Sequence, residues 1–415
     1  MKRFFCVCLA LMIAVIGVSC NSSGEEAMFP LKQEMKTDGQ LYQEGEVLFP
    51  SSLWETPFAE EYPELNYEEE NIKSYFIDSI QDTKVFVFVG IPQTASAENK
   101  VPGIVLVHGG NGTAYYEWVN YWVQRGYAAI AMDTEGNMPL DTSLMTNDFR
   151  KESIRKHGPS NSALTDMNAP VEQQWAYHAI ASIIVSNSFL RSFDCVDVNH
   201  IGISGISYGA FLTCQAVAYD DRYVFAAPVY GSLEQKIGKT TFSSLVQGKA
   251  GQLWDDIDIL QENETPFLFL NGNKDYWFSI ESTTKCQKST KYSLMSLKNS
   301  FVHGQPQGAL EVPEVYAFAD YFCYGKQALL KITEQPKPGK AELKVQVPNK
   351  IDIKEVIGYY TTDDILDMNT EWKTVSGTEK NGVCTADIPK SAIYFYLSVI
   401  DDRGLEISSN VISVK

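Results

Sequence analysis

The hydrophobic positions of this chain change their spacing along the sequence, and each change indicates a different kind of structure. Two runs with alternating apolar residues, IKSYFIDSI and TKVFVFVGI, flank Gln81-Asp82 and predict a β-hairpin. From Pro102 onward, short apolar runs alternate with segments of helical spacing. Alternation of buried strands with helices predicts a mostly parallel sheet that is covered on both faces, so the expected fold class is α/β.

The middle of the chain supplies the strands and helices of this expected sheet. Strands are predicted at GIVLVHGGNG, YAAIAMDTEG, HIGISG, FAAPVYG, FLFLNGN and YSLMSLKN. Helices are predicted at EWVNYWVQRG, VEQQWAYHAIASIIVSNSFLRS and YGAFLTCQAVA, and Gly126 is expected to end the first of them. The segment from about residue 136 to 170 has no regular spacing and is predicted to be a loop.

A second shift in pattern follows TEQPKPGK, which we interpret as a linker rich in proline and glycine. Beyond it, AELKVQV, EVIGYYTT, YFYLSVID and NVISV are short alternating runs, which are typical of a small immunoglobulin-like β-sandwich. The chain is therefore expected to begin with a signal peptide (1–19) and a tether with an N-terminal segment (20–70). The α/β domain (71–332), the linker (333–340) and an all-β domain (341–415) are expected to follow.

Composition limits the partners of the chain more than it limits the fold. With 44% hydrophobic and 21% charged residues, the protein has the composition of an ordinary globular protein. Its formal net charge of −18 argues against nucleic acid or anionic lipid as a partner. The cysteines show no C-x-x-C spacing, and the sequence implies no metal or cofactor.

The N-terminus indicates export. Basic Lys2-Arg3 precedes an apolar run that is too short for a comfortable membrane span. The stretch VIGVSCNSSGEE resembles the lipobox of bacterial lipoproteins, although Gly17 stands where that pattern usually has leucine. We therefore expect Cys20 to carry lipid and to anchor an extracytoplasmic protein to the outer membrane or cell surface, with a cleaved secretory peptide as the alternative.

The clearest chemical motif is GISYG, which places Ser207 between Gly205 and Gly209 in a G-x-S-x-G pattern. HIGIS before it predicts a buried strand, and AFLTCQAVAY after it predicts a helix. Strand, sharp turn and helix are the context of a nucleophile elbow, in which the serine projects from the turn. A chance match to five letters is the alternative, and partners for the serine decide between the two.

A nucleophilic serine needs a base, and the base needs an acid that orients it. His303, in NSFVHGQPQG, is the one histidine that follows Ser207 in the chain. Asp275 lies just beyond the predicted strand FLFLNGN, in a loop at the same expected edge of the sheet, with Asp220 and Asp221 as rival acids. The order serine, aspartate, histidine is the order of the elbow-containing hydrolases.

Acyl transfer also requires hydrogen-bond donors for the oxyanion. The backbone N–H of Tyr208, the residue after the serine, is one expected donor. The other should come from VHGGNG, where we favour Gly110 over Asn111 and expect His108 to shape the loop. Four aromatic residues near the same edge are candidate substrate contacts or packing residues: Trp277, Tyr276, Trp175 and Tyr230. His157, in the long loop, is a further candidate substrate contact.

These segments together resemble α/β-hydrolase esterases of the acetyl xylan esterase and dienelactone hydrolase type, over roughly residues 70–328. The resemblance implies the α/β-hydrolase fold and a serine esterase that forms an acyl-enzyme and acts on acetyl-type groups of carbohydrate. Ser207, Asp275 and His303 fall on the triad positions of the family, and Gly110 and Tyr208 on its oxyanion donors. Carbohydrate deacetylases of this superfamily usually show R-G-Q, G-x-S-Q-G and H-E, where this chain has TEG, GISYG and HG.

Two other functions fit parts of the same pattern. A serine peptidase of the prolyl-oligopeptidase type would share the catalytic domain, but only some 50 residues are available here for the large N-terminal domain such enzymes carry. A non-catalytic surface binding protein would have no reason to keep serine, aspartate and histidine in register. The expected substrate is an ester, with polysaccharide-linked esters as a class that suits an extracytoplasmic location.

Overall fold

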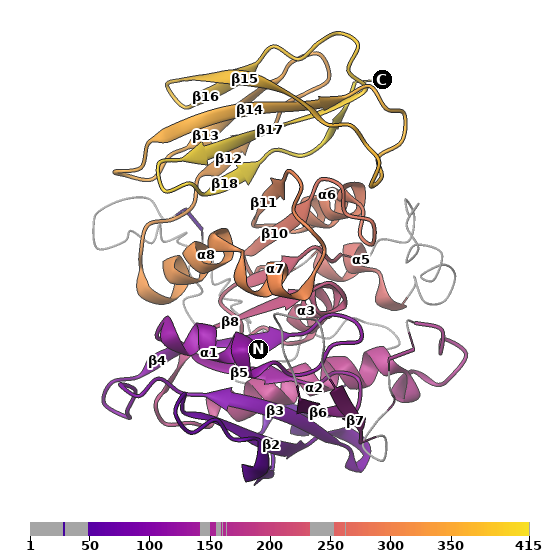
Figure 1. Cartoon of the computed structure of the whole chain (residues 1–415), viewed down its shortest axis with the longest axis vertical. Helices are drawn as coiled ribbons and strands as arrows, with labels where there is room; N and C mark the ends of the chain where they lie inside the picture. Colours follow the sequence, from indigo (N-terminus) through magenta and orange to yellow (C-terminus); the bar gives the residue numbers. More distant parts are fainter. Residues whose placement is uncertain are drawn as a thin grey trace, which may run out of the picture.

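A computed structural model of the chain describes residues 28–29, 49–141, 150–154, 159, 161–162, 164–232, 253–261 and 263–414. Its centre is a nine-stranded sheet, seen in Figure 1. The strands are β1 (Ala59–Glu61), β2 (Ile72–Asp78), β3 (Lys84–Gly90), β4 (Val101–Val107), β5 (Ala128–Met132), β8 (Val196–Ile206), β9 (Ala226–Val229), β10 (Phe267–Gly272) and β11 (Ser293–Lys298). Their order across the sheet is β1-β2-β3-β5-β4-β8-β9-β10-β11.

Most of this sheet is parallel. Strands β5, β4, β8, β9, β10 and β11 run in one direction, whereas β1, β2 and β3 form an antiparallel extension at one edge. The predicted hairpin is β2–β3, and both residues of its turn, Gln81 and Asp82, have positive φ. The predicted α/β-hydrolase fold class is confirmed.

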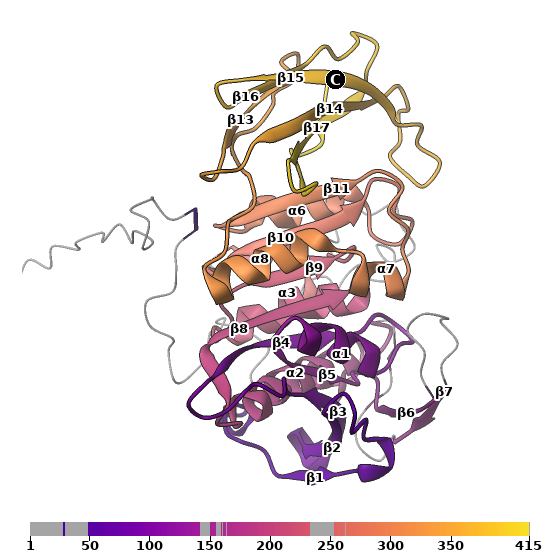
Figure 2. The same ribbon diagram turned by 60° about the vertical axis from the view of Figure 1, so that its left-hand side comes forward.

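Alternate residues of the strands face opposite sides of the sheet and form two hydrophobic clusters. In β4, for example, Val105 and Val107 join one cluster, and Ile104 and Leu106 join the other. The helices divide accordingly, as Figure 2 shows. One face is covered by α2 (Trp175–Arg191), α3 (Tyr208–Tyr219), α5 (Asp256–Leu260) and α6 (Ile280–Ser289), and the other by α1 (Tyr116–Gln124), α7 (Gln305–Leu310) and α8 (Pro313–Tyr324).

Two described stretches of the N-terminal segment pack on opposite faces of the α/β domain: Phe29 contacts Phe318 and Phe322 of α8, and residues 49–53 pack along α2. Phe49 stacks on Tyr177 with ring centroids 4.5 Å apart, and the Ser188 hydroxyl donates to the Leu53 carbonyl at 2.6 Å. Cys20 and the expected signal peptide lie outside the described residues. Within those residues, no helix has both the length and the apolar character that a membrane span requires.

The structure differs from the sequence-based expectation in the predicted loop 136–170. This stretch contains a two-stranded antiparallel ribbon, β6 (Asn137–Asp141) and β7 (Arg150–Ser153). The sequence gives little sign of this ribbon, because β6 has only five residues with Pro139 at its centre and β7, RKES, has no apolar residue.

The expected linker 333–340 is a hairpin turn of the C-terminal domain. Strand β12 (Lys331–Glu334) pairs with β13 (Glu342–Gln346), and Lys337 bridges to Lys340 at the turn. Gly339 has a φ of 75°, a conformation that glycine adopts without strain. The prolines therefore mark a turn inside the β domain, which begins at β12 rather than at residue 341.

The C-terminal domain is entirely antiparallel. Its other strands are β14 (Ile353–Thr361), β15 (Lys373–Lys380), β16 (Val383–Ala386), β17 (Tyr394–Asp401), β18 (Glu406–Ser408) and β19 (Ile412–Ser413). The first half of β15 pairs with β14 and its second half with β16. The expected two layers are thereby joined into one continuous sheet, β12-β13-β16-β15-β14-β17-β18.

This β domain lies against β11, the edge strand of the large sheet, as both views show. The Ser408 hydroxyl accepts a hydrogen bond from the backbone N–H of Leu297 (3.0 Å) and donates to its carbonyl (3.3 Å). The Glu314 carboxylate binds the Lys298 ammonium at 2.7 Å and accepts from the backbone N–H of Glu406 at 3.0 Å. The domain thus covers an edge strand whose backbone groups would otherwise face water.

A buried ion pair joins the end of α3 to α2. Arg222 donates through Nε and Nη2 to the two carboxylate oxygens of Asp220, at 2.7 and 2.8 Å, and Asn187 of α2 donates to the same carboxylate at 2.9 Å. Burial alone would raise the pKa of Asp220, but the Arg222 guanidinium outweighs it and holds that pKa below its usual value.

We expect Arg222→Ala to lower the free energy of unfolding by about 3–5 kcal/mol, because it leaves the Asp220 carboxylate buried without a counter-charge. Urea denaturation followed by circular dichroism measures the loss. Lys291→Ala is the control, because Lys291 forms an exposed pair with Glu264 and should give no measurable change. Equal effects of the two substitutions would contradict the prediction.

Candidate active site

Ser207 lies on a sharp turn between β8 and α3. It is the N-cap of α3 and has φ 56° and ψ −121°, a conformation that non-glycine residues rarely adopt. The turn depends on close contact: a Cβ atom on Gly205 would overlap the Gly209 carbonyl, and one on Gly209 would overlap the Val107 carbonyl. Both glycines of the motif are therefore required by the packing of α3 against β4 and β8.

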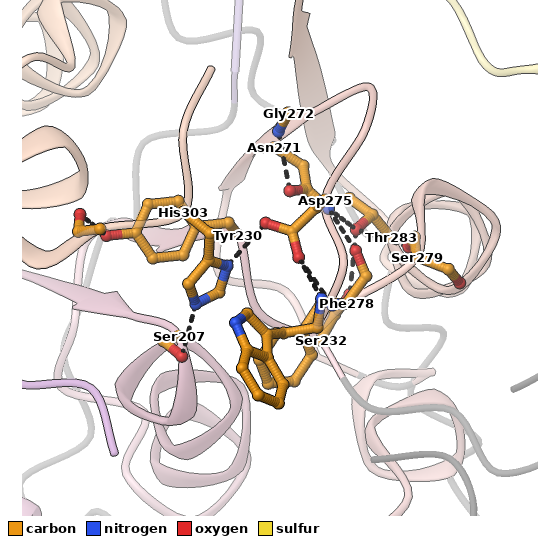
Figure 3. A network of polar contacts seen from close by, with 12 residues as sticks. Ser207, Tyr230, Ser232, Asn271, Gly272, Asp275, Phe278, Ser279, Thr283 and His303 are labelled. Atoms are coloured by element: carbon orange, nitrogen blue, oxygen red, sulfur yellow. Dashed lines mark hydrogen bonds and ion pairs between the residues drawn. The ribbon is translucent and has the colours of Figure 1, made fainter. Parts of the chain in front are cut away.

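His303 connects Ser207 to Asp275 by hydrogen bonds (Figure 3). The Nε2 atom of His303 is 2.9 Å from the Ser207 hydroxyl, and its Nδ1 atom is 2.6 Å from the Asp275 carboxylate. The second carboxylate oxygen of Asp275 accepts from the backbone N–H groups of Trp277 and Phe278, both at 2.8 Å. These bonds fix the carboxylate and leave Nε2 directed at the serine.

The three residues come together because each follows a strand of the parallel sheet. Ser207 follows β8, Asp275 follows β10, and His303 lies in the loop after β11. Parallel neighbours end at the same edge of a sheet, so loops that are far apart in sequence meet there. Asp220, a rival acid in the sequence, is instead buried against Arg222.

A cavity of about 350 Å³ opens over the serine. Its walls include the loop after β4, the elbow, the end of β9 and the His303 loop. The lining residues are Gly109, Gly110, Asn111, Ser207, Tyr208, Tyr230, Trp277, His303, Gly304 and Gln305. Among these, Gly304 and Gln305 had no role in the sequence-based interpretation.

His108 shapes the loop after β4, as its position in the sequence suggested. Its Nδ1 atom is 2.7 Å from the Gly109 carbonyl, and its Nε2 atom accepts from the backbone N–H of Thr134 at 2.9 Å. Because Nε2 accepts that bond, the ring proton is on Nδ1 and bonds to Gly109. The imidazole thus ties the glycine loop to the loop after β5.

Glu135, which the sequence did not single out, holds the next residue of the same loop. Its buried carboxylate accepts from the backbone N–H of Asn111 at 2.7 Å and from the side chain of Asn161 at 2.9 Å. Since the Asn111 N–H is used in this way, Gly110 is the better placed of the two proposed oxyanion donors. The only signal in the sequence was an acidic residue just after a buried strand.

The predicted aromatic contacts occupy different environments. Trp277 is 38% exposed and lines the cavity, whereas Tyr276, at 47% exposed, does not. Trp175 is fully buried behind the ring of Tyr208, and its Nε1 donates to the Thr134 carbonyl, so it is a packing residue rather than a substrate contact. His157 lies outside the described residues.

Tyr230 forms a wall of the cavity and contacts His303. Its backbone has a φ of 38°, its ring centroid is 4.2 Å from that of His303, and its hydroxyl donates to the Gly304 carbonyl at 2.5 Å. Burial, with a smaller contribution from the Asp275 carboxylate, raises the pKa of Tyr230, so the hydroxyl stays protonated. Through this hydrogen bond to Gly304, Tyr230 holds the loop that carries His303 against the end of β9.

The described residues contain no group of three or more histidine, cysteine or acidic side chains that could hold a metal ion. Five cysteines in this part of the chain are free thiols.

Comparison with known families places part of the α/β domain near one group of esterases. Residues 53–235 match the family model of acetyl xylan esterase (AXE1). This part of the chain is therefore similar to the acetyl xylan esterases. The matched residues include the loop after β4 and the turn that carries Ser207. Asp275 and His303 lie beyond the end of the match. The match supports the prediction that the chain is a carboxylic ester hydrolase. A search of curated proteins found no match.

Solved structures with a similar fold include esterases and peptidases. The acetyl xylan esterase from Paenibacillus sp. R4 is 16% identical, with 60% of this chain and 84% of that one covered and a TM-score of 0.48. Acetyl xylan esterase 1 from Thermoanaerobacterium sp. JW/SL YS485 is 14% identical, with 59% of this chain and 81% of that one covered and a TM-score of 0.46. The acylaminoacyl peptidase of Pyrococcus horikoshii is 18% identical, with 56% of this chain and 37% of that one covered and a TM-score of 0.43.

We expect Gly110→Ala to reduce kcat for p-nitrophenyl acetate by about 100-fold or more, because the loss of one oxyanion donor has that effect. Alanine keeps the backbone N–H, but its Cβ would overlap Cδ2 of the Tyr208 ring. Because the Tyr208 ring packs edge-on against Trp175 and Phe278, we expect relief of this overlap to displace the N–H of residue 110 from the oxyanion.

Gly325→Ala is the matched control for this glycine substitution. Gly325 caps α8 with a φ of 63° and has open space around it, so alanine there should lower the melting temperature and leave kcat unchanged. Wild-type kcat in Gly110→Ala, measured on folded protein, would contradict the assignment of the donor.

Proposed function

We propose that the protein is a serine esterase that removes acetyl-type acyl groups from carbohydrate through an acyl-enzyme. The observation that carries the proposal is the unbroken chain of hydrogen bonds from Asp275 through His303 to Ser207, which ends at the cavity. A serine hydroxyl is a weak nucleophile on its own, and a histidine oriented by a carboxylate is the group that activates it.

In the first half of the reaction, Ser207 Oγ attacks the ester carbonyl while His303 Nε2 takes its proton. Asp275 keeps the Nδ1 proton in place and stabilises the imidazolium that forms. The backbone N–H groups of Gly110 and Tyr208 bind the oxyanion of the tetrahedral intermediate, and the N-terminal end of α3 adds a favourable dipole. The alcohol then leaves with the proton from His303.

In the second half, water replaces the alcohol. His303 removes a proton from the water as it attacks the acyl carbon, and the same donors stabilise the second oxyanion. Collapse of this intermediate returns the proton to Ser207 and releases the acid. Each step uses only groups that line the cavity or bond directly to those that do.

The shape of the site supports a small acyl group on a larger alcohol. The cavity of about 350 Å³ is bounded by the rings of Tyr208 and Tyr230, and Trp277 forms an exposed rim where a bulky alcohol would emerge. Aromatic rims of this kind give apolar contact area at low entropic cost. The match to the acetyl xylan esterase model is the second support for acetyl esters of carbohydrate.

We expect Ser207→Ala to lower kcat/KM for acetylated xylo-oligosaccharides by at least about 10,000-fold, because the proposed acyl-enzyme forms on the Ser207 hydroxyl. Released acetate is measured by a coupled assay, with aryl acetates, feruloyl esters and longer-chain aryl esters in parallel. Ser204→Ala is the matched control, since this serine is on the same strand but bonds to the Ala227 carbonyl away from the cavity.

The panel also separates the competing functions. Absence of ester hydrolysis by the wild type, or unchanged hydrolysis by Ser207→Ala, would refute the proposal. Cleavage of aminoacyl amides in preference to all esters would favour a peptidase. Preference for feruloyl or long-chain esters would retain the serine mechanism and change the substrate.

We further propose that the protein is lipid-anchored at Cys20 outside the cytoplasm. In the native host, Cys20→Ala should move the protein from the membrane fraction to the soluble extracytoplasmic fraction and abolish labelling with a fatty-acid analogue. Cys195→Ala, a thiol within the α/β domain, is the control and should leave both unchanged. Wild-type protein that is soluble and unlabelled would indicate a cleaved secretory peptide instead.

A further inference from the structure

The β domain contacts the loop that carries Asp275, and it does so at Asn273. This residue follows β10 and is only 2% exposed. Its backbone carbonyl accepts from Trp372 Nε1 at 3.0 Å, and its side-chain Nδ2 donates to the Tyr396 hydroxyl at 2.9 Å. Since both aromatic residues belong to the β domain, that domain holds the main chain and the side chain of Asn273.

The same Asn273 side chain contacts the loop that carries His303. Its Nδ2 also donates to the Asn299 side chain at 3.2 Å, and its Oδ1 accepts from the backbone N–H of Ser300 at 3.4 Å. The two loops touch directly, because a Cβ on Gly272 would lie 2.5 Å from the Phe301 carbonyl. Asn273 therefore joins the two loops close to the Asp275–His303 hydrogen bond.

Within the β domain, the two contacting residues are held rigidly. Tyr396 is fully buried, stacks on Tyr359 with centroids 4.7 Å apart, and meets Trp372 edge-on at 5.1 Å. Tyr359 and Tyr396 also belong to the same hydrophobic cluster as α3 and α6 of the α/β domain. Movement of these rings would therefore disturb a core that both domains share.

We propose that the β domain positions the acid and the base of the site, with Trp372 and Tyr396 as positioning residues that act through Asn273. The inference rests on the function proposed above. Asp275 and His303 both lie in loops beyond β10 and β11, the two strands at the edge of the large sheet. Lateral support at that edge sets the separation of the two loops, and with it the 2.6 Å contact between carboxylate and imidazole.

The test compares Tyr396→Phe, Trp372→Phe and the double variant in the full chain. Tyr396→Phe keeps the ring and removes only the hydroxyl that bonds to Asn273. Trp372→Phe removes the indole N–H that bonds to Asn273 and, with it, part of the ring that packs against Tyr396. For the double variant we expect kcat for an aryl acetate to fall about 10-fold to 100-fold with KM almost unchanged, because a displacement of about 1 Å at the catalytic groups has that effect. Each single variant should show a smaller loss.

Tyr359→Phe is the matched control. It removes a hydroxyl from the same aromatic stack, but that hydroxyl does not bond to Asn273. It should keep the wild-type kcat. A loss of kcat in Tyr359→Phe equal to that of the double variant would indicate general loosening of the domain and overturn the inference, as would wild-type kcat in the double variant.

A readout without substrate separates this inference from the proposed function. The proton shared by His303 and Asp275 should give a low-field ¹H NMR signal in the wild type and in Tyr359→Phe, and this signal should shift or broaden in the double variant. If the wild type hydrolyses no ester, the proposed function fails, and the NMR comparison alone decides the positioning role. An unchanged signal in the double variant refutes that role.

Discussion

The backbone of Ser207 is the constraint on which the rest of the site depends. A serine at φ 56° persists only where its surroundings hold it there, and here β8, α3 and β4 all do so through contacts that tolerate no Cβ at Gly205 or Gly209. The same contacts bring the glycine loop after β4 next to the elbow. The geometry of the proposed nucleophile and that of the proposed oxyanion donors are thus fixed by one packing arrangement.

The other two members of the proposed triad have no comparable constraint of their own. Asp275 and His303 lie in loops beyond the last two strands of the sheet, where only one neighbouring strand supports β11 within the sheet. Tyr230 holds the His303 loop from one side through Gly304, and the contacts at Asn273 hold both loops from the other. Hydrogen bonds between residues far apart in sequence therefore hold Asp275 and His303, whereas tight steric packing holds Ser207.

Those differences explain which parts of the site could be predicted from sequence. The elbow leaves a local signature, since strand, glycine-flanked serine and helix are contiguous, and a lone downstream histidine needs no knowledge of packing. Trp175 and Trp277 could not be distinguished, because both are aromatic residues near a strand end and only tertiary packing buries one and exposes the other. Glu135 and Asn273 act through the backbone of other loops, and no spacing in the sequence records such contacts. Strand β12 was missed because it is four residues long and is followed by prolines that suggest a linker.

Asp220 and Asp275 show how one residue type serves two purposes in the same domain. Both side chains are buried, and a buried carboxylate must be compensated. Asp220 faces Arg222, a permanent cation, so its charge is neutralised in the resting protein and is of no use to a reaction. Asp275 receives three N–H donors, two from the backbone and one from His303, whose positive charge arises only when it takes a proton. Backbone N–H groups hold the Asp275 carboxylate in place without a permanent counter-charge, and this arrangement suits the role proposed for it, the stabilisation of an imidazolium at His303.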